Sequence, residues 1–506
     1  MMMRPIVLSH LKAGGESSAA LAAPGRLSLT YGQLRALVAR THRQLAARGI
    51  GPGDRAAIVL PNGPEMASCF LAIASGLSAA PLNPSYTKAE FDFYLSDLRP
   101  KLVLVEEGAD SPVRQSALDL GIAVAELHVA EGDPAGAFTL WPEEAASTPP
   151  SHEHEALVLH TSGTTSRPKV VPLSQANLFA SANSVATALA LSPSDQCLNI
   201  MPLFHIHGLI GVLLSSISAG ASVCCTPGFN ALRFFTWVDE TQPSWYSAVP
   251  TMHQAILQRA ERNRELVARS KLRLIRSSSA SLPPAVFNAL HETFGCPIIE
   301  AYGMTEATHQ MASNPLGPGK QKPGFVGRAA GPEIRILDAR GRSLPAGVEG
   351  EVCIRGDNVT AGYDNNPEAN AASFIDGWFR TGDQGFLDED GYLKISGRIK
   401  EIINRGGEKI SPLEVDDVLI EHPAISQVVT FGMPHKSLGE EVAVVVVLVE
   451  GQKLVLSDVQ EFAAGRLAPF KIPRKLVVLD EIPKGATGKV QRIGLAKVLG
   501  LTETQA

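Results

Sequence analysis

The chain has 506 residues and a mass of 53.7 kDa, more than one hydrophobic core normally organises, so we expect at least two domains. Hydrophobic residues make up 45% and charged residues 19% of the chain, a composition that excludes a disordered protein. The net charge of −6, without a basic block, argues against a nucleic acid as the main partner.

The first 200 residues alternate between two kinds of apolar pattern. Amphipathic stretches predict helices over 34–49, 66–77, 90–98 and 178–189. Short apolar runs between them predict buried strands over 55–60, 79–82, 101–105 and 196–201. This alternation is typical of an α/β fold in which helices cover parallel sheets.

The pattern changes after a Pro- and Gly-rich zone over 314–331. Short strands separated by turns, expected at 333–337, 351–354 and 391–395, predict a distorted antiparallel barrel. A tail of about 100 residues then mixes helix and strand. Its helix over 412–422 begins after Ser411, with Glu414 placed for a capping box. We expect an N-terminal domain over 1–398 and a small α+β C-terminal domain over 399–506.

No segment is expected to insert into a membrane. The most apolar run, 442–449, is far too short to span a bilayer, and its valines suit a buried strand. The first residues lack the apolar core of a signal peptide, and the last four are not a peroxisomal address. The six cysteines form no Cys-x-x-Cys pair, so we expect reduced thiols and a cytoplasmic protein.

The stretch 157–169 is the most informative motif. A short apolar run ends at His160 and is followed by six small or hydroxylated residues and then by Arg167 and Lys169. Small residues let backbone N–H groups and hydroxyls converge on phosphate oxygens, which the cations neutralise. The motif predicts a triphosphate-binding loop that is not a P-loop. A Ser/Thr-rich surface turn is the alternative.

Distant segments contain the other parts of a nucleotide site. In 300–306, Tyr302 suits an adenine face, Thr305 a phosphate oxygen and Glu306 a magnesium ion. In 377–383, Asp383 follows a tight turn, where it suits vicinal ribose hydroxyls. The structural alternatives are a helix-start acid for Glu306 and a plain β-turn for the segment 377–383. The stretches 397–401, 404–412 and 483–492 complete the set.

Together these segments resemble the adenylate-forming (AMP-binding) superfamily of acyl-CoA synthetases, amino-acid adenylation domains and luciferases, from Leu29 through Arg492. Five segments are most similar to its oxalate–CoA ligase (oxalyl-CoA synthetase) branch: 201–208, 245–251, 276–281, 305–309 and 403–412. The resemblance implies a ligase that uses ATP, Mg²⁺ and coenzyme A to activate a small carboxylic acid, with oxalate as the first choice. It gives no expectation for the oligomeric state.

The resemblance also implies roles for individual residues. Lys489 is the lysine of the adenylation step, and Lys400 is the hinge about which a mobile C-terminal domain swings between half-reactions. Arg398 contacts ribose or phosphate, and Gly406 and Gly407 let pantetheine pass close to the backbone. The phosphate loop comprises the catalytic Thr161 with Ser162, Gly163, Thr164, Thr165 and Lys169.

The acyl pocket is expected around His205, Ser279 and His309. By resemblance, His205 closes the pocket, while Ser279 and His309 offer a hydroxyl and an imidazole to a second carboxylate. A core histidine is the alternative for His309. His205 and His207, two apart on a strand, would share one face as zinc ligands, but no third ligand follows at a suitable spacing.

One departure from the family pattern concerns the phosphate loop. Where relatives have Pro-Lys-Gly, this chain has Pro168-Lys169-Val170. A positive φ at Val170 would strain the loop, whereas an extended backbone would accept valine.

Three functions fit these motifs. The first is an acid–CoA ligase for oxalate or a similar acid. The second is an adenylation enzyme that loads a separate carrier protein, and the third is a catalytically silent nucleotide-binding homologue. Retention of Lys169, Glu306, Asp383, Arg398 and Lys489 argues against the third.

Overall fold

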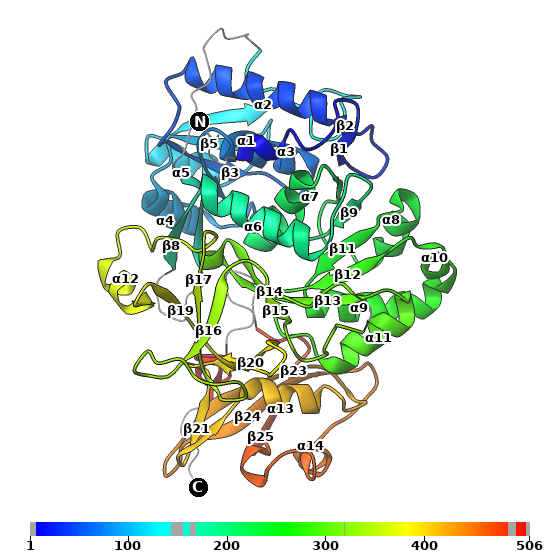
Figure 1. The fold of residues 1–506 in the computed structure, drawn as a ribbon, viewed down its shortest axis with the longest axis vertical. Helices are drawn as coiled ribbons and strands as arrows, with labels where there is room; N and C mark the ends of the chain where they lie inside the picture. Colours follow the sequence, from blue (N-terminus) through cyan, green and yellow to red (C-terminus); the bar gives the residue numbers. More distant parts are fainter. Residues whose placement is uncertain (1–6, 143–154, 162–167, 318, 484–491, 502–506) are drawn as a thin grey trace.

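The computed structural model describes residues 7–142, 155–161, 168–317, 319–483 and 492–501. These residues form four sheets, three of them in a large N-terminal part and one in a smaller C-terminal part (Figure 1). Over the described residues, no helix is both long and apolar enough to cross a bilayer.

The first sheet has six strands in the order β6-β5-β3-β4-β7-β8. All pairs are parallel except β7–β8, which forms an antiparallel hairpin. The strands are β3 (Arg55–Val59), β4 (Ser78–Pro81), β5 (Leu102–Glu106), β6 (Ala123–Leu127), β7 (Glu155–Thr161) and β8 (Lys169–Ser174). The preceding and intervening helices are α1 (Val7–His10), α2 (Tyr31–Ala46), α3 (Pro64–Ala74), α4 (Lys88–Leu98) and α5 (Val113–Asp119).

The second sheet has nine strands in the order β15-β14-β13-β12-β11-β9-β10-β1-β2. Near one end of this sheet, β1 lies between the edge strand β2 and β10, and it pairs in parallel with β10 through Leu21 and Val223. The strands are β1 (Ala19–Ala22), β2 (Leu29–Thr30), β9 (Gln196–Asn199), β10 (Ser222–Cys225), β11 (Trp245–Ala248), β12 (Leu274–Ser277), β13 (Ile298–Met304), β14 (His309–Ser313) and β15 (Arg328–Ala329).

Helices lie beside the second sheet in the middle part of the molecule (Figure 1). They include a π-helix, η1 (His207–Leu214), which lies against β9 and β14 and consists only of buried residues. The others are α6 (Gln175–Ala188), α7 (Ser215–Ser218), α8 (Phe234–Thr241), α9 (Pro250–Ala260), η2 (Glu261–Asn263), α10 (Arg264–Arg269), α11 (Pro284–Phe294) and η3 (Thr305–Ala307).

The third sheet is antiparallel, with the order β16-β17-β19-β18 and with β20 paired to β19. Its register shifts within the β17–β19 and β19–β20 pairs give the irregular shape expected of this region. The strands are β16 (Glu333–Leu337), β17 (Gly350–Arg355), β18 (Phe374–Ile375), β19 (Trp378–Leu387) and β20 (Leu393–Arg398), with α12 (Pro367–Ser373) before β18.

The C-terminal part has its own sheet and core, at the lower end of Figure 1. Its long hairpin β23–β24 contains the expected valine-rich strand. The strands are β21 (Ile403–Arg405), β22 (Glu408–Ile410), β23 (Ile425–His435), β24 (Gly439–Leu448) and β25 (Lys475–Val478), and the helices are α13 (Pro412–Leu419), α14 (Leu456–Ala463), η4 (Pro469–Lys471) and α15 (Leu495–Val498). The predicted fold class, α/β with a separate C-terminal domain, is confirmed.

Helix ends account for the differences from the predicted ranges. Helix α2 begins three residues earlier than expected because Thr30 and Gln33 form a capping box that the apolar pattern alone does not indicate. In α13, the Ser411 hydroxyl accepts from the Glu414 N–H, but the Glu414 carboxylate instead contacts Lys471 at 2.6 Å. Only half of the predicted capping box therefore forms, and the helix ends at Leu419.

Candidate active site

Two adjacent strands of the third sheet bring an acid and a base against β13. Asp383 on β19 is in register with Arg398 on β20, and Arg398 Nε lies 3.0 Å from Asp383 Oδ1. The Tyr302 hydroxyl, from β13, donates to Asp383 Oδ2. Burial, reinforced by the Asp383 charge, holds the pKa of Tyr302 well above its usual range, so the phenol stays a donor.

A tight turn at Gly377, with φ 79°, precedes β19, as expected. Asp383 lies within this ten-residue strand, directly after Gly382, whose φ is 73°. The strand orients the carboxylate toward Tyr302 and Arg398.

A second group of charges surrounds Glu306 on η3. The Tyr363 hydroxyl donates to Glu306 Oε1 at 2.9 Å, and Lys169 Nζ lies 4.3 Å from the centre of the Tyr363 ring. Burial raises the pKa of Glu306 above its ordinary value, while Tyr363, Arg398 and Lys169 oppose that shift. The structure thus joins the predicted nucleotide residues Lys169, Glu306, Asp383, Arg398 and Tyr302 into one electrostatically connected site.

Tyr363 was not predicted, because it belongs to none of the sequence motifs. Its place is fixed by its neighbour Asp364, whose N–H donates to the Val170 carbonyl at 2.9 Å. Asp364 also accepts from Arg55 Nη2 at 2.9 Å. These two bonds attach the 363–364 segment to the first sheet and keep the phenol over Lys169.

The described part of the phosphate loop is the hairpin that flanks it. Thr161 ends β7 and is in register with Lys169, the first residue of β8. Val170 pairs with His160 in this hairpin, so its backbone is extended and a β-branched side chain fits without strain. Ser162, Gly163, Thr164 and Thr165 lie outside the described residues.

A polar cluster is buried at the carboxyl ends of β9, β11 and β12. His207, the first residue of η1, has its Nε2 2.6 Å from Ser247 Oγ and its Nδ1 3.0 Å from Ser279 Oγ. The His207 and His309 rings stack 5.0 Å apart, and His309 Nε2 lies 3.0 Å from Arg276 Nη2. The structure therefore brings Ser279 and His309 together, as predicted, and adds Ser247, Arg276 and His207.

Backbone conformation supports a special role for this cluster. Ser279 has φ 74° and His309 has φ 98°, values that non-glycine residues adopt rarely. Such strain persists only where the surrounding structure enforces it, and it gathers at functional sites. The sequence signal for Arg276 is a lone charge inside the buried strand 274–277.

His205 lies apart from this cluster. It is half-buried in the turn before η1, with its ring 4.6 Å from that of Phe204. The premise that His205 and His207 share a strand face is wrong, because the segment is a turn followed by a π-helix. Both ring nitrogens of His207 face serine hydroxyls, which leaves no support for zinc at this pair.

Gly211 makes the close packing of His309 feasible. A Cβ at this position would lie 2.3 Å from His309 Nε2. We expect Gly211→Ala to displace the imidazole from Arg276 and to raise the KM for the acid ~10-fold or more, since overpacking costs ~1–3 kcal/mol. Steady-state kinetics with the acid as the varied substrate measure this effect.

The matched control is Gly76→Ala, whose Cβ would lie 2.6 Å from Nε2 of another buried histidine, His42. That variant should lose similar stability in thermal unfolding and keep the KM for the acid. An equal rise in KM for both variants would contradict a local role for Gly211.

The remaining predicted residues occupy separate places. Thr305 is the first residue of η3, beside Glu306. Lys400 is exposed in the turn that joins β20 to the C-terminal part. Gly406 and Gly407, with φ 60° and 98°, form the tight turn between β21 and β22. Lys489 lies outside the described residues.

The C-terminal motif ends in a structural ion pair. Arg492 contacts the Asp416 carboxylate on α13, and its Nε donates to the Thr430 carbonyl at 3.1 Å. This arginine therefore anchors the end of the motif to its own domain's helix and hairpin.

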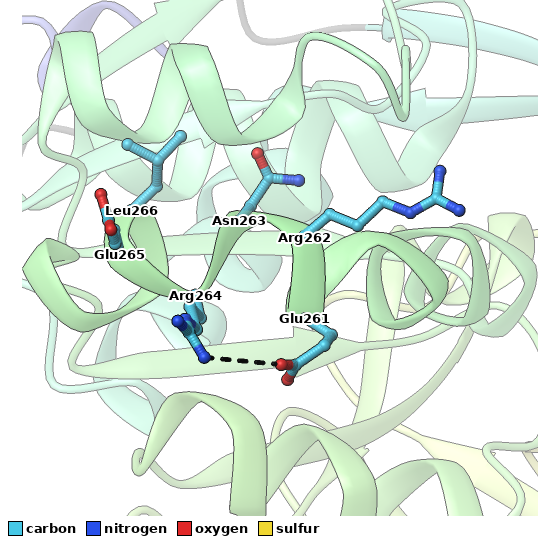
Figure 2. A pocket seen from close by; sticks show the side chains of 6 residues that line it. All are labelled: Glu261, Arg262, Asn263, Arg264, Glu265 and Leu266. Atoms are coloured by element: carbon cyan, nitrogen blue, oxygen red, sulfur yellow. Dashed lines mark ion pairs between the residues drawn. The ribbon is translucent and has the colours of Figure 1, made fainter.

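A surface hollow over 261–266 is unrelated to these residues. Figure 2 shows its lining side chains, with Arg264 and Glu261 4.0 Å apart in an ion pair. It lies on η2 and α10, and none of its residues belongs to the motifs. The candidate site is instead defined by the two polar clusters.

Glu300 is a buried carboxyl behind the site. It is 1% exposed, its Oε1 accepts from the Leu282 N–H at 3.0 Å, and its Oε2 has no hydrogen-bond partner in the described structure. Burial raises its pKa to about 8. The folded protein thus retains a proton that the unfolded chain releases near pH 4.5, so this group lowers stability as the pH rises from 4.5 to 8.

We expect Glu300→Gln to remove that pH dependence. The free energy of unfolding of the variant, relative to that of the wild type, should increase by up to about 1.4 kcal/mol per pH unit below pH 8. The difference between the two Tm values should therefore increase in favour of the variant from pH 6 to pH 8.5. Thermal unfolding across this range tests it, with the exposed Glu292→Gln as control. A difference that stays constant with pH would refute the buried-proton assignment.

Comparison with known proteins identifies the family. The model of the AMP-binding enzyme family matches residues 12–364, and that of the AMP-binding enzyme C-terminal domain matches residues 414–489. The chain belongs to the AMP-binding enzyme family. It is an AMP-forming acyl-CoA synthetase, an enzyme that joins an acid to coenzyme A at the expense of ATP.

Among curated relatives, the chain is 46% identical over 490 residues to an oxalate–CoA ligase of Arabidopsis thaliana, covering 94% of each chain. It is 42% identical over 473 residues to an oxalate–CoA ligase of Saccharomyces cerevisiae, covering 88% of this chain and 86% of that one. Among solved structures, ATP-bound MatB from Rhodopseudomonas palustris is 29% identical with a TM-score of 0.88, covering 98% and 99% of the two chains.

Proposed function

We propose that this acyl-CoA synthetase acts on oxalate. The observation that carries the proposal is the buried polar cluster of Ser279, His207, His309 and Arg276, which supplies hydrogen-bond donors where a fatty acid would need an apolar wall. The two oxalate–CoA ligases among its relatives support the same acid.

The reaction has two steps. One carboxylate oxygen attacks the α-phosphorus of ATP, pyrophosphate leaves, and an acyl-adenylate forms. The sulfur of coenzyme A then attacks the acyl carbon, AMP leaves, and a thioester forms. Neither step needs an enzyme nucleophile, so the protein contributes positioning and charge neutralisation.

The nucleotide is assigned to the site around Asp383. We assign the ribose hydroxyls to the Asp383 carboxylate, ribose or phosphate to Arg398, and the adenine face to Tyr302. The phosphates are assigned to Thr305, Lys169 and the loop that contains Thr161, Ser162, Gly163, Thr164 and Thr165. Two cations support this assignment: Arg398, which lies 3.0 Å from Asp383, and Lys169, which lies over the Tyr363 ring. Both are available to neutralise phosphate charge.

Mg²⁺ is assigned to Glu306. Its carboxylate is buried and held by the Tyr363 hydroxyl, and Mg²⁺ on ATP typically takes only one or two protein carboxylates. Bound there, the ion would neutralise phosphate charge. Glu306 orients one oxygen toward Tyr363, and Lys169 adds a fixed positive charge nearby.

The two half-reactions are assigned to two orientations of a mobile C-terminal domain, with the boundary between residues 398 and 399. Lys400, exposed in the connecting turn, is the hinge, because a charged residue there stays solvated in both orientations. We assign Lys489 to adenylation, His205 to closure of the acyl pocket, and the Gly406–Gly407 turn to the passage of pantetheine.

A panel of acids tests this function. Pyrophosphate release should be measured with ATP, Mg²⁺, coenzyme A and oxalate, malonate, acetate, a medium-chain fatty acid or a cinnamate. A clear preference for oxalate is expected, and a preference for an apolar acid would overturn the assignment of substrate while leaving the reaction class intact. Replacing coenzyme A by a phosphopantetheinyl carrier tests the alternative acceptor.

A further inference from the structure

Arg276 is a buried cation without a counter-charge. It is 0% exposed, and its contacts over the described residues are all with uncharged acceptors or rings. They are His309 Nε2 at 3.0 Å, Gln310 Oε1 at 3.2 Å, and His207 Nε2 and Ser247 Oγ at 3.4 Å. Its Nε has no hydrogen-bond partner there. Burying an unpaired charge of this kind is unfavourable unless a ligand compensates it.

Another arginine of the same segment provides the comparison. Arg273 lies three residues earlier, and its Nε is 2.6 Å from the Asp195 carboxylate. Among the described residues, the structural arginine Arg273 is thus paired with a carboxylate and Arg276 is not. Burial lowers the pKa of Arg276 only to about 10, so it carries its charge at neutral pH.

Arg276 determines where the two imidazoles carry their protons. A guanidinium only donates hydrogen bonds, so His309 Nε2 must accept from Arg276 Nη2 and cannot itself carry a proton. The neutral ring then has its proton on Nδ1.

The same argument applies to His207. Its Nε2 faces Arg276 Nη1 at 3.4 Å, which can only donate, and lies 2.6 Å from Ser247 Oγ, which itself accepts from Arg276 and can donate its hydroxyl hydrogen to Nε2. With Nε2 an acceptor, Nδ1–H donates to Ser279 Oγ at 3.0 Å. The Ser279 hydroxyl hydrogen is therefore directed away from His207, and Ser279 is half-buried rather than sealed from solvent.

We propose that Arg276 is a positioning residue that selects small acids with a second anionic group, because it holds His207 and His309 as Nδ1–H donors and adds a positive charge that no carboxylate in the described part of the chain neutralises. The proposal rests on the acid–CoA ligase function and names the class of substrate: dianions such as oxalate. A monocarboxylate would leave this charge uncompensated.

Arg276→Met tests the proposal, because it keeps the volume of the buried side chain and removes its charge. At pH 8, the KM for oxalate in ATP–pyrophosphate exchange should rise ~30-fold or more. The KM for ATP and that for acetate should stay within about threefold of the wild type. A comparable loss for oxalate and acetate would overturn the proposal.

The contrast between the two acids separates this role from a structural one. A merely structural loss would weaken oxalate and acetate alike, whereas the loss of a charge that serves the second anionic group raises the KM for oxalate alone.

Two further variants complete the test. Arg276→Gln removes the charge with a polar side chain and should behave like Arg276→Met, so it decides the matter if the methionine variant does not fold. Arg273→Met, which breaks the paired arginine, should lower the Tm without changing the ratio of the oxalate and acetate KM values.

The wild type distinguishes failure of this proposal from failure of the oxalate assignment. A wild type that prefers malonate would refute oxalate, and the Arg276 variants are then compared with malonate and acetate in the same way. A wild type that prefers acetate to every dianion would overturn the role of Arg276.

Discussion

Replacing Lys489 by alanine is expected to slow acyl-adenylate formation by ~10²–10³, because it would remove the positive charge that we assign to the reacting phosphate. Thioester formation from supplied acyl-AMP should be largely unchanged, since the α-phosphate bond is already made. Pyrophosphate exchange measures the first half-reaction, and CoA consumption from synthetic oxalyl-AMP measures the second. Comparison of the two rates isolates the role of this lysine.

Lys497 provides the matched control, because it is an exposed lysine on α15 of the same domain. Lys497→Ala should leave both half-reactions unchanged. An equal loss of both half-reactions in a folded Lys489→Ala protein would contradict the division of labour between the two orientations of the domain.

The second large effect is expected for Asp383→Asn. The amide keeps the shape of the side chain but removes the charge that pairs with Arg398 at 3.0 Å and the carboxylate that accepts from Tyr302. Arg398 is then left without its ion-pair partner in the proposed nucleotide site. We expect the KM for ATP to rise at least ~10-fold, equivalent to ~1.4 kcal/mol, with a smaller effect on the KM for the acid.

Asp388→Asn is the control for this variant. Asp388 also pairs with a base, Lys322, at 2.7 Å, but follows β19 outside the nucleotide site. Its loss should leave the KM for ATP unchanged. If both variants raised that KM equally, the effect would come from the third sheet as a whole.

The grouping of the residues that we assign to the nucleotide was predictable from sequence, because these residues belong to short local motifs. Thr161, Lys169, Tyr302, Glu306, Asp383 and Arg398 each stand within a recognisable stretch, and the sheets bring the described stretches together. Tyr363 was missed because its position depends on two long-range bonds from Asp364, to Val170 and Arg55. No local pattern records a contact between residues so far apart in the chain.

The polar cluster that we assign to the acyl pocket was predictable only in part. Ser279 and His309 were expected, but His207 was considered only as a zinc ligand and Arg276 only as part of a motif. Their roles depend on the strand register, which sets Arg276 beside Ser247, and on the π-helix that presents His207 to both serines. A π-helix is rare and often marks a functional site, yet periodicity does not distinguish it from an ordinary helix.

The pairing of β1 with β10 sets a constraint on synthesis by the ribosome. Strand β1 can take its place only after β10 is made, about 200 residues later, and at ~5–20 residues per second this takes ~10–40 s. During that interval β1 lacks its partner strand β10, and the apolar face of α2 lacks the completed sheet against which it would be buried. The nascent chain is therefore expected to be most prone to aggregation, and most dependent on chaperones, before Cys225 emerges.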